Sequence, residues 1–172
     1  MKTKFLGKQN KNLKKSGKTL LDSIERKKED IHLGVDIWNI YDFMYLDAKK
    51  IPHLLVLEIK IPSKSNLIIE SKSMKIYLNH FYNRSFKSKR EILYIIKKDI
   101  ESRIKSNIKV KFISSFSNEP KTIDLNSLKS ISTPVKRVLK FNGFRSICPV
   151  TSQPDFANIY IYSDGSIETK WL

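Results

Sequence analysis

The segment RSICPVTSQPDF, residues 145–156, contains the single cysteine of the chain, and a carboxylate follows that cysteine seven positions later. A cysteine thiolate is a strong nucleophile, and a carboxyl group beside it can give a proton to the group that sulfur attacks. Pro149 and Pro154 restrain the backbone around Cys148 and Asp155, so both side chains could face one cavity. The spacing also fits an inert, buried cysteine and a turn-capping aspartate, and spacing alone favours this structural pair because free cysteines are commonly buried. Spacing alone therefore leaves a catalytic pair and a structural pair open.

Other chemistries have less support in the sequence. The three histidines, His32, His53 and His80, and the one cysteine show no paired spacing typical of metal ligands. The five glycines form neither a GxGxxG motif nor a phosphate-binding loop. We therefore expect no metal site, and we expect any nucleotide cofactor to bind through other residues.

Composition predicts a folded and strongly basic protein. The net charge of +16 comes from 33 lysines and arginines against 17 acidic residues, and it attracts anions of any kind. A drift towards lysine on solvated faces explains this charge equally well. One cysteine cannot form an internal disulfide, and no apolar run has the length of a signal peptide core or a membrane span. We expect a cytoplasmic protein with no membrane partner.

Alternating residues predict the sheet that would position the site. Residues 35–46 and 53–61 are rich in β-branched and aromatic side chains and are separated by DAKKIP, which predicts a hairpin. The stretch MKIYL, residues 74–78, alternates and predicts another strand, and IKVKFISSF, residues 108–116, predicts a further one. In the segment that starts at residue 88, isoleucines recur every four positions after a capping box, SKRE. This segment is the one helix that the sequence predicts with a clear signal.

These elements predict an α+β fold, in two layers, with an antiparallel sheet covered by helix on one face. Residues 1–32 are expected to form a basic arm or a short covering segment, and residues 33–116 to form the sheet and its helix. Residues 117–137 are polar, contain two prolines and predict a connection. Residues 138–172 contain one run typical of a strand and a predicted turn at 164–165, which is too little to close a core.

Two segments together closely resemble a known family. These are ESKSMKIYLNHF, residues 70–81, and RSICPVTSQPDFANIYIYSDG, residues 145–165, and both are similar to segments of the NADPH-dependent 7-cyano-7-deazaguanine reductases, nitrile reductases of the tunnelling-fold superfamily. GVDIWNIYDFMYLDAKKIP, residues 34–52, also looks like the N-terminal region of this family. The resemblance covers roughly residues 33–172. It implies a tunnelling fold and an oxidoreductase that acts in the biosynthesis of queuosine, a tRNA modification.

The order of the two motifs resembles that in the long branch of the family, in which two tunnelling-fold modules follow one another. Glu70 precedes Cys148, as it does when the first module bears E-S-K-S and the second bears the cysteine. The resemblance implies a first module at 33–116 and the beginning of a second module at 138–172. The long branch continues beyond the position of Leu172, so we expect a C-terminally truncated chain with an incomplete second module.

The resemblance implies roles for the cysteine and the carboxylate. Cys148 matches the nucleophile that adds to the nitrile carbon and gives a covalent thioimide, and Asp155 matches the proton donor. NADPH then reduces the group twice and gives the primary amine, 7-aminomethyl-7-deazaguanine. Ile147 and Phe156 depart from the usual residues of the long branch, asparagine and tryptophan, and His80 does not match the substrate-binding histidine of that branch.

The first motif matches binding positions of the family. Ile69, Glu70 and Ser71 match positions that contact the deazaguanine, and Ser71 with Lys72 matches positions that contact NADPH. A carboxylate can accept hydrogen bonds from the N1–H and the exocyclic amine of a guanine-like base, and an ammonium group can meet a phosphate. The family also implies a homo-oligomer, a dimer or larger, with no direct contact to nucleic acid.

Two alternatives to an active reductase stay open. The chain could be an inactive or partial fragment that acts as an assembly subunit, either with a separately encoded remainder or with a site completed across a homo-oligomer. It could also be a basic domain that binds nucleic acid through its lysines. A reductase requires Cys148 and Asp155, whereas a nucleic-acid-binding module has no use for them.

Overall fold

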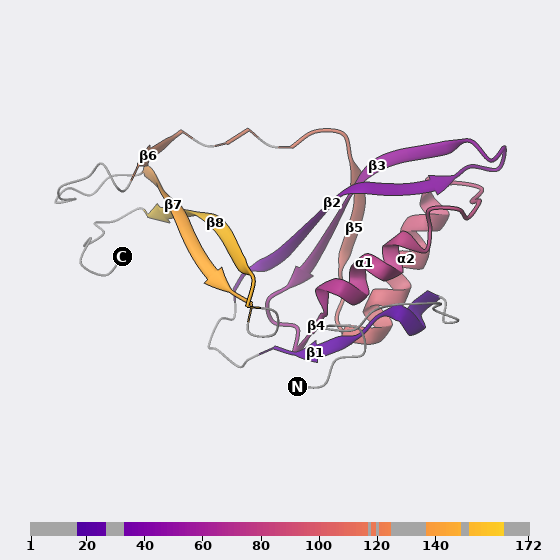
Figure 1. Ribbon diagram of the computed structural model, residues 1–172, viewed down its shortest axis with the longest axis horizontal. Helices are drawn as coiled ribbons and strands as arrows, with labels where there is room; N and C mark the ends of the chain where they lie inside the picture. The colour runs from indigo at the N-terminus through magenta and orange to yellow at the C-terminus, as the bar shows by residue number, and fades with distance from the viewer. Residues whose placement is uncertain are drawn as a thin grey trace. The chain divides into compact units, whose positions relative to one another are not determined.

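The chain folds into two compact units, Met1–Phe116 and Ser117–Leu172 (Figure 1). In this computed structural model, the backbone is described for residues 17–26, 33–116, 118–119, 121–124, 137–148 and 152–163, and the side chains for the same residues except 123, 137 and 163. The described residues combine antiparallel strand pairs with two α-helices, which confirms the α+β class. Among them, no helix has the length and apolar character needed to cross a bilayer.

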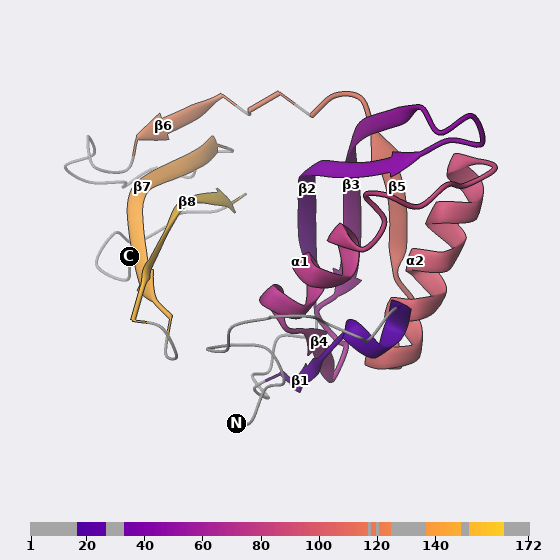
Figure 2. The same cartoon turned by 45° about the vertical axis from the view of Figure 1, so that its right-hand side comes forward.

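The core of the first unit is a three-stranded antiparallel sheet. It consists of β2 (Val35–Leu46), β3 (Pro52–Pro62) and β5 (Lys109–Ile113) in the order β2-β3-β5. The predicted hairpin and the predicted strand after the helix are thus confirmed. Both helices lie on the same face of this sheet (Figure 2).

Helix α2 (Lys89–Ile104) follows the predicted pattern. Its isoleucines at four-residue intervals, Ile92, Ile96, Ile100 and Ile104, are all buried. The Ser88 hydroxyl caps the helix by accepting the Glu91 N–H at 3.2 Å, as the capping box predicts. The Glu91 carboxylate reaches back one residue further than expected and accepts the N–H of Lys87 at 2.9 Å.

The strand predicted for residues 74–78 is wrong, because this segment belongs to helix α1 (Ser71–Asn79). The preceding strand, β4 (Leu67–Ile69), ends where Glu70 caps the helix. Met74, Tyr77 and Leu78 are buried at helical spacing, whereas the intervening Ile76 is only half-buried. Apolar residues at positions 74, 76 and 78 fit both periods, and the cap together with the packing of residue 77 selects the helix.

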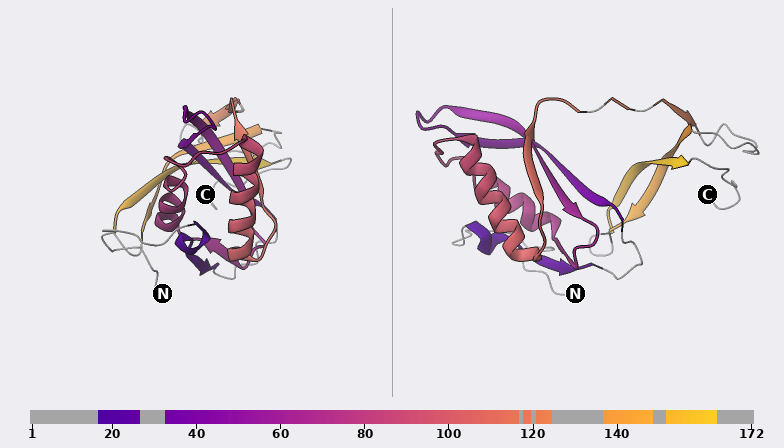
Figure 3. Two further views of the ribbon diagram at one scale, coloured as in Figure 1. Left: turned by 90° about the vertical axis from the view of Figure 1, so that its right-hand side faces the viewer. Right: turned by 180° about the vertical axis from the view of Figure 1, so that it is seen from behind.

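Part of the predicted N-terminal arm belongs to the core. A 3₁₀ turn, η1 (Gly17–Leu20), packs against both helices (Figure 3), and β1 (Ser23–Glu25) pairs antiparallel with β4. Leu20 and Leu21 are 2% and 0% exposed. Residues 17–26 therefore form the expected covering segment, and residues 1–16 and 27–32 of the predicted arm lie outside the described residues.

The second unit contains another three-stranded sheet. It has the order β6-β7-β8, from β6 (Thr122–Asp124), β7 (Arg137–Ile147) and β8 (Pro154–Ser163). β7 and β8 form an antiparallel hairpin, and β6 pairs parallel with β7. β6 lies inside residues 117–137, so part of the predicted connection is a strand. The predicted turn at 164–165 lies outside the described residues.

Candidate functional site

The hairpin of the first unit contains a β-bulge. Pairing runs from Ile40 opposite Leu57 to Phe43 opposite Leu55, so two residues of β2 stand against one residue of β3. Four pairs follow the bulge, from Phe43 opposite Leu55 to Leu46 opposite Pro52. A five-residue loop, 47–51, then joins the strands.

The hairpin of the second unit has the same plan. Pairing runs from Phe141 opposite Ile159 to Phe144 opposite Ala157, again two residues against one, and four pairs follow. Gly143 lies in this bulge with a φ of 88°, a conformation that glycine adopts without steric cost. The loop, 148–153, is one residue longer than that of the first hairpin.

Cys148 is the first residue of the loop of the second hairpin, and Asp155 is the second residue of β8, which follows the loop. The Cys148 N–H donates to the Gln153 carbonyl at 2.9 Å, and the Ser152 N–H donates to the Cys148 carbonyl at 3.0 Å. Ser146 stands directly opposite Asp155 in the ladder. Because side chains alternate between the two faces of a strand pair, Ser146, Cys148 and Asp155 share one face. The half-buried cysteine and the exposed aspartate are diagonal neighbours, which in hairpins lie about 7–8 Å apart at Cα.

The same two positions of the first hairpin hold a hydrogen-bonded pair, Asp47 and His53. Asp47 is the first loop residue there, and its N–H donates to the Ile51 carbonyl at 2.9 Å, as the Cys148 N–H does to Gln153. Asp47 Oδ2 lies 3.1 Å from His53 Nε2, and Tyr45 stacks on the imidazole. The hydrogen bond from His53, followed by that from the Ile51 amide, lowers the pKa of Asp47 below its usual value. Side chains at these diagonal positions can therefore reach one another in this type of hairpin.

The E-S-K-S motif forms the start of helix α1. The Glu70 carboxylate accepts the N–H groups of Lys72 and Ser73, both at 2.8 Å, and the Ser71 hydroxyl donates to it at 3.4 Å. Glu70 is 3% exposed, and the side chain of Ile69 is buried in the core. Ser71 is exposed and Lys72 is half-buried. The four predicted binding residues are thus adjacent, and Glu70 has a structural role as a helix cap.

Two residues that the sequence did not single out hold this motif in place. Ser73 is fully buried, and its hydroxyl donates to the Glu70 carbonyl at 2.7 Å while accepting the Asp22 N–H at 3.0 Å. The Glu70 N–H in turn donates to the Asp22 carbonyl at 2.9 Å. A serine three residues after an acidic residue is the available sequence signal, but its partner is 51 residues away. The N-terminal segment therefore fixes the position of Glu70.

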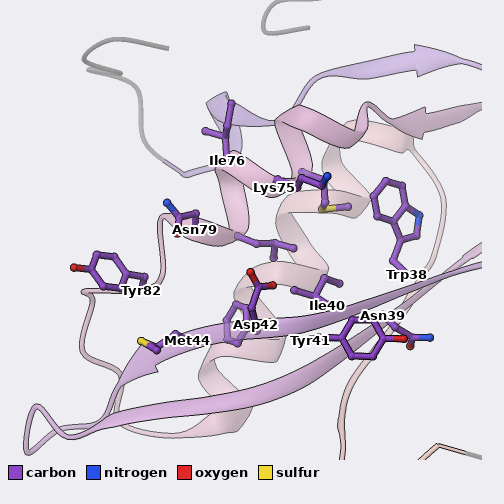
Figure 4. A pocket seen from close by; sticks show the side chains of 13 residues that line it. Trp38, Asn39, Ile40, Tyr41, Asp42, Met44, Lys75, Ile76, Asn79 and Tyr82 are labelled. Carbon is purple, nitrogen blue, oxygen red and sulfur yellow. The ribbon is translucent and has the colours of Figure 1, made fainter. Parts of the chain in front are cut away.

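Helix α1 and strand β2 also enclose a pocket of about 610 Å³ (Figure 4). Its walls include Trp38, Met74 and Leu78, and Figure 4 shows Asp42 pointing from the bulge of β2 towards α1. Within the described part of the chain, the Asp42 carboxylate has no hydrogen bond or ion pair. None of the predicted site residues lines this pocket. The sequence does not reveal the pocket, because a bulge is not visible in the alternation.

The predicted residues are distributed over both units. Ile69, Glu70, Ser71 and Lys72 belong to the first unit, and Cys148 and Asp155 belong to the second. In the described ranges, no three histidine, cysteine or acidic side chains come together in a way that could hold a metal ion. The arrangement thus offers a thiol with a carboxyl group on one hairpin, and a capped helix start with an exposed hydroxyl and an ammonium group.

The chain is similar to known proteins. Residues 13–112 match the family model described as nitrile reductase, 7-cyano-7-deazaguanine-reductase N-term. Proteins named NADPH-dependent 7-cyano-7-deazaguanine reductase are similar to the chain. The protein from Buchnera aphidicola subsp. Schizaphis graminum is 31% identical over 157 residues, which cover 77% of this chain and 59% of that protein. The protein from Coxiella burnetii (strain Dugway 5J108-111) is 31% identical over 151 residues, with coverages of 77% and 54%.

A third relative, from Hahella chejuensis, is 30% identical over 155 residues, which cover 77% of this chain and 57% of that protein. The chain therefore spans somewhat more than half the length of these curated relatives. The family model covers more than half of the chain, and it includes the hairpin β2–β3, the E-S-K-S motif and both helices. The chain belongs to the 7-cyano-7-deazaguanine reductase family of nitrile reductases.

Proposed function

We propose that this chain takes part in the NADPH-dependent reduction of the nitrile of 7-cyano-7-deazaguanine to a primary amine, with Cys148 as the nucleophile and Asp155 as the proton donor. The observation that carries this proposal is the register of the second hairpin, which puts the thiol and the carboxyl group on one face as diagonal neighbours. The names of the relatives support the substrate and the cofactor.

The proposed reaction begins with Cys148 and Asp155 and proceeds in two reductions. The Cys148 thiolate forms a bond to the nitrile carbon, one π bond of the nitrile breaks, and the nitrogen takes a proton from Asp155, which gives a thioimide. NADPH, when bound, supplies the two hydrides that the change from nitrile to amine requires. The carbon–sulfur bond must break between the two reductions, and Cys148 leaves as the thiolate. Asp155, once deprotonated, needs one further proton from solvent for the second reduction.

The start of α1 offers groups that fit a phosphorylated cofactor. Ser71 has an exposed hydroxyl group, and Lys72 adds an ammonium group beside it. The N–H groups of Lys72 and Ser73 are already bound by Glu70, so a phosphate would be held by side chains rather than by the helix amides. We propose that Ser71 and Lys72 hold NADPH in this way.

Glu70 combines a cap with the proposed recognition of the base. Oε1 accepts the Lys72 amide and the long contact from the Ser71 hydroxyl, whereas Oε2 accepts only the Ser73 amide and keeps a second lone-pair position. Glu70 can therefore stay bound to α1 while it accepts the N1–H or the exocyclic amine of the deazaguanine. Ile69 is buried, so we propose that it contributes through its backbone, and Ser71 through its hydroxyl group.

We further propose that residues 33–116 form a tunnelling-fold module and that residues 138–172 begin a second one after the connection 117–137. The common register of the hairpins β2–β3 and β7–β8 supports a repeated module. In the described residues, each three-stranded sheet has two edge strands whose outer edges have no strand partner. Such edges pair with further strands, which supports a homo-oligomer. We also propose that the chain acts in the cytoplasm.

Intact-mass spectrometry tests the proposed nucleophile. The full chain is incubated with 7-cyano-7-deazaguanine in the absence of NADPH, beside the Cys148→Ala variant. We expect a mass increase of one substrate molecule, because addition to a nitrile releases no leaving group, and we expect no increase in the variant. If a chain that is folded by circular dichroism forms no adduct, Cys148 is not a nucleophile here, and a role as an assembly subunit replaces the proposal.

A further inference from the structure

A groove on the first unit that includes none of the predicted site residues is lined by four lysines. It has a volume of about 830 Å³ and lies where the end of α2 meets the start of β5, two elements that are adjacent in Figure 2. Lys97 and Lys105 come from α2 and its C-terminal cap, Lys64 from the turn after β3, and Lys109 from β5. Four lysines from three parts of the fold thus line one groove.

The groove keeps most of this positive charge. Its one acidic residue, Glu101, lies 3.8 Å from the Lys97 ammonium group and accepts the N–H of Ile108 at 2.9 Å. In the described parts of the chain, Lys64, Lys105 and Lys109 have no carboxylate within ion-pair distance. Four positive charges and one negative charge leave a net charge of +3 around the groove.

The β3–β5 ladder adds to the repulsion between these lysines. Lys109 stands directly opposite Lys60, and like charges in this position destabilise a sheet. The nearby carboxylate of Glu58 is shared, at 3.5 Å from Lys60 and 3.3 Å from Lys111, so Lys109 gains no partner from it. A bound polyanion would compensate this repulsion.

The shape and lining of the groove favour an extended anion. It borders the C-terminal end of α2, whose carbonyl groups carry partial negative charge, so it offers no cradle of amides for a single tightly held phosphate. Long lysine side chains that start from different elements can instead follow successive phosphates. Among the described residues of the lining, only Pro62 and Ile108 are apolar, and none is an aromatic residue on which a base could stack.

We propose that this groove binds the sugar-phosphate backbone of a nucleic acid, without selectivity for the bases. This site lies outside the residues assigned to the nitrile chemistry, and it departs from the sequence-based expectation of no direct contact to nucleic acid. It does not depend on the proposed reductase activity. A chain without nucleophilic activity would still bind through these lysines.

Fluorescence anisotropy with a labelled oligouridine RNA tests the proposal on the full chain. Affinity is measured between about 50 and 200 mM salt for the wild type and for Lys64→Gln combined with Lys109→Gln. Each phosphate contact to a single strand contributes about 0.7 to the slope of log affinity against log salt. We therefore expect the magnitude of the slope to fall by about 1.4 in the double variant.

A matched control carries the same change in net charge. Lys87→Gln combined with Lys89→Gln removes two exposed lysines at the opposite end of α2, and we expect the slope to change much less. Equal changes in both pairs would overturn the proposal, because the binding would then depend on overall charge. Displacement of the RNA by inorganic pyrophosphate at constant ionic strength would also overturn it, since the groove would then be a site for small phosphates.

Discussion

The two hairpins of this chain share a register but differ in their surroundings. Both place a two-against-one bulge four pairs before the loop. Phe43 is the first residue after the bulge in the first hairpin and is 2% exposed beneath α1 and α2, whereas Phe144, at the same position of the second hairpin, is 43% exposed. Strand pairing is thus encoded locally in each hairpin, whereas burial depends on the elements that cover it.

The comparison also shows that equivalent positions of the two hairpins hold different chemical groups. The two sites on either side of the loop hold Asp47 and His53 in the first hairpin, and Cys148 and Asp155 in the second. In one case the side chains form a hydrogen bond beside the turn. In the other, equivalent positions hold a thiol and a carboxyl group. The backbone supplies the proximity, and the residue types decide whether the pair forms a structural contact or offers groups for the proposed catalysis.

The largest expected effect concerns Asp155, the proposed proton donor of the second hairpin. Asp155→Asn should slow the formation of the nitrile adduct about 10²- to 10⁴-fold, because the nitrogen loses its proton donor. The substitution at the same position of the first hairpin, His53→Gln, should leave the rate unchanged. Time-resolved intact-mass spectrometry measures both rates. Equal rates for wild type and Asp155→Asn would remove the assigned role of this carboxyl group.

The next effect compares the burial of the two hairpins. Phe43→Ala should lower the free energy of unfolding by about 3–5 kcal/mol, because it leaves a cavity beneath the helices. Phe144→Ala, at the same register position, should cost about 1.5 kcal/mol or less, because that ring is already partly in water. Urea unfolding followed by circular dichroism measures both values. A similar cost for the two variants would show that the second hairpin is covered in solution.

A smaller effect concerns the motif that only the first unit has. Glu70→Ala should lower the free energy of unfolding by about 0.5–2 kcal/mol, because two helix amides lose their acceptor. Ser71→Ala serves as the control and should change stability little, because its hydroxyl makes only a long contact of 3.4 Å. Thermal unfolding compares the two. If Glu70→Ala is as stable as the control, the cap does not contribute to stability.

The smallest effect is the response of the first hairpin to acid. The pKa of Asp47 is lowered in the folded state, so this group adds stability above its unfolded pKa of about 3.9, and the contribution is lost as the pH falls through the folded pKa. Asp47→Asn should therefore flatten the dependence of the unfolding midpoint on pH below about 4. Urea titrations at a series of pH values measure this. An unchanged pH profile would contradict the assigned interaction between Asp47 and His53.

The sequence correctly predicted the elements whose hydrophobic pattern fits either the strand period or the helix period, but not both. The alternation of residues 53–61 and the four-residue repeat of isoleucines from Ile92 to Ile104 each fit one period, and both elements formed as predicted. Helix α1 was missed because residues 74–78 fit both periods. The decision depends on the Glu70 cap and on the contact of Ser73 with Asp22, which is far away in the chain. Local pattern cannot report such a partner.

The sequence named residues for the candidate site but not their geometry. The resemblance named Cys148 and Asp155, and the spacing of seven residues left their relation open. The loop hydrogen bonds of Cys148 and the pairing of Ser146 with Asp155 put them on one face. The pocket beside Asp42 and the lysine groove depend on side chains from several elements, so no linear motif announces them.

Disulfide trapping tests the register of the second hairpin, on which the assignment of Cys148 and Asp155 to one face depends. In a Cys148→Ala background, Ser146→Cys is combined either with Asp155→Cys or with Phe156→Cys. The chains are oxidised, and disulfide formation is measured by intact-mass spectrometry. Directly opposite residues lie within the range of a disulfide, whereas a shift of one residue points the side chains to opposite faces. We predict rapid bond formation in the first combination and little in the second. Preferential oxidation of the second combination would mean a shifted register and would contradict a common face for Cys148 and Asp155.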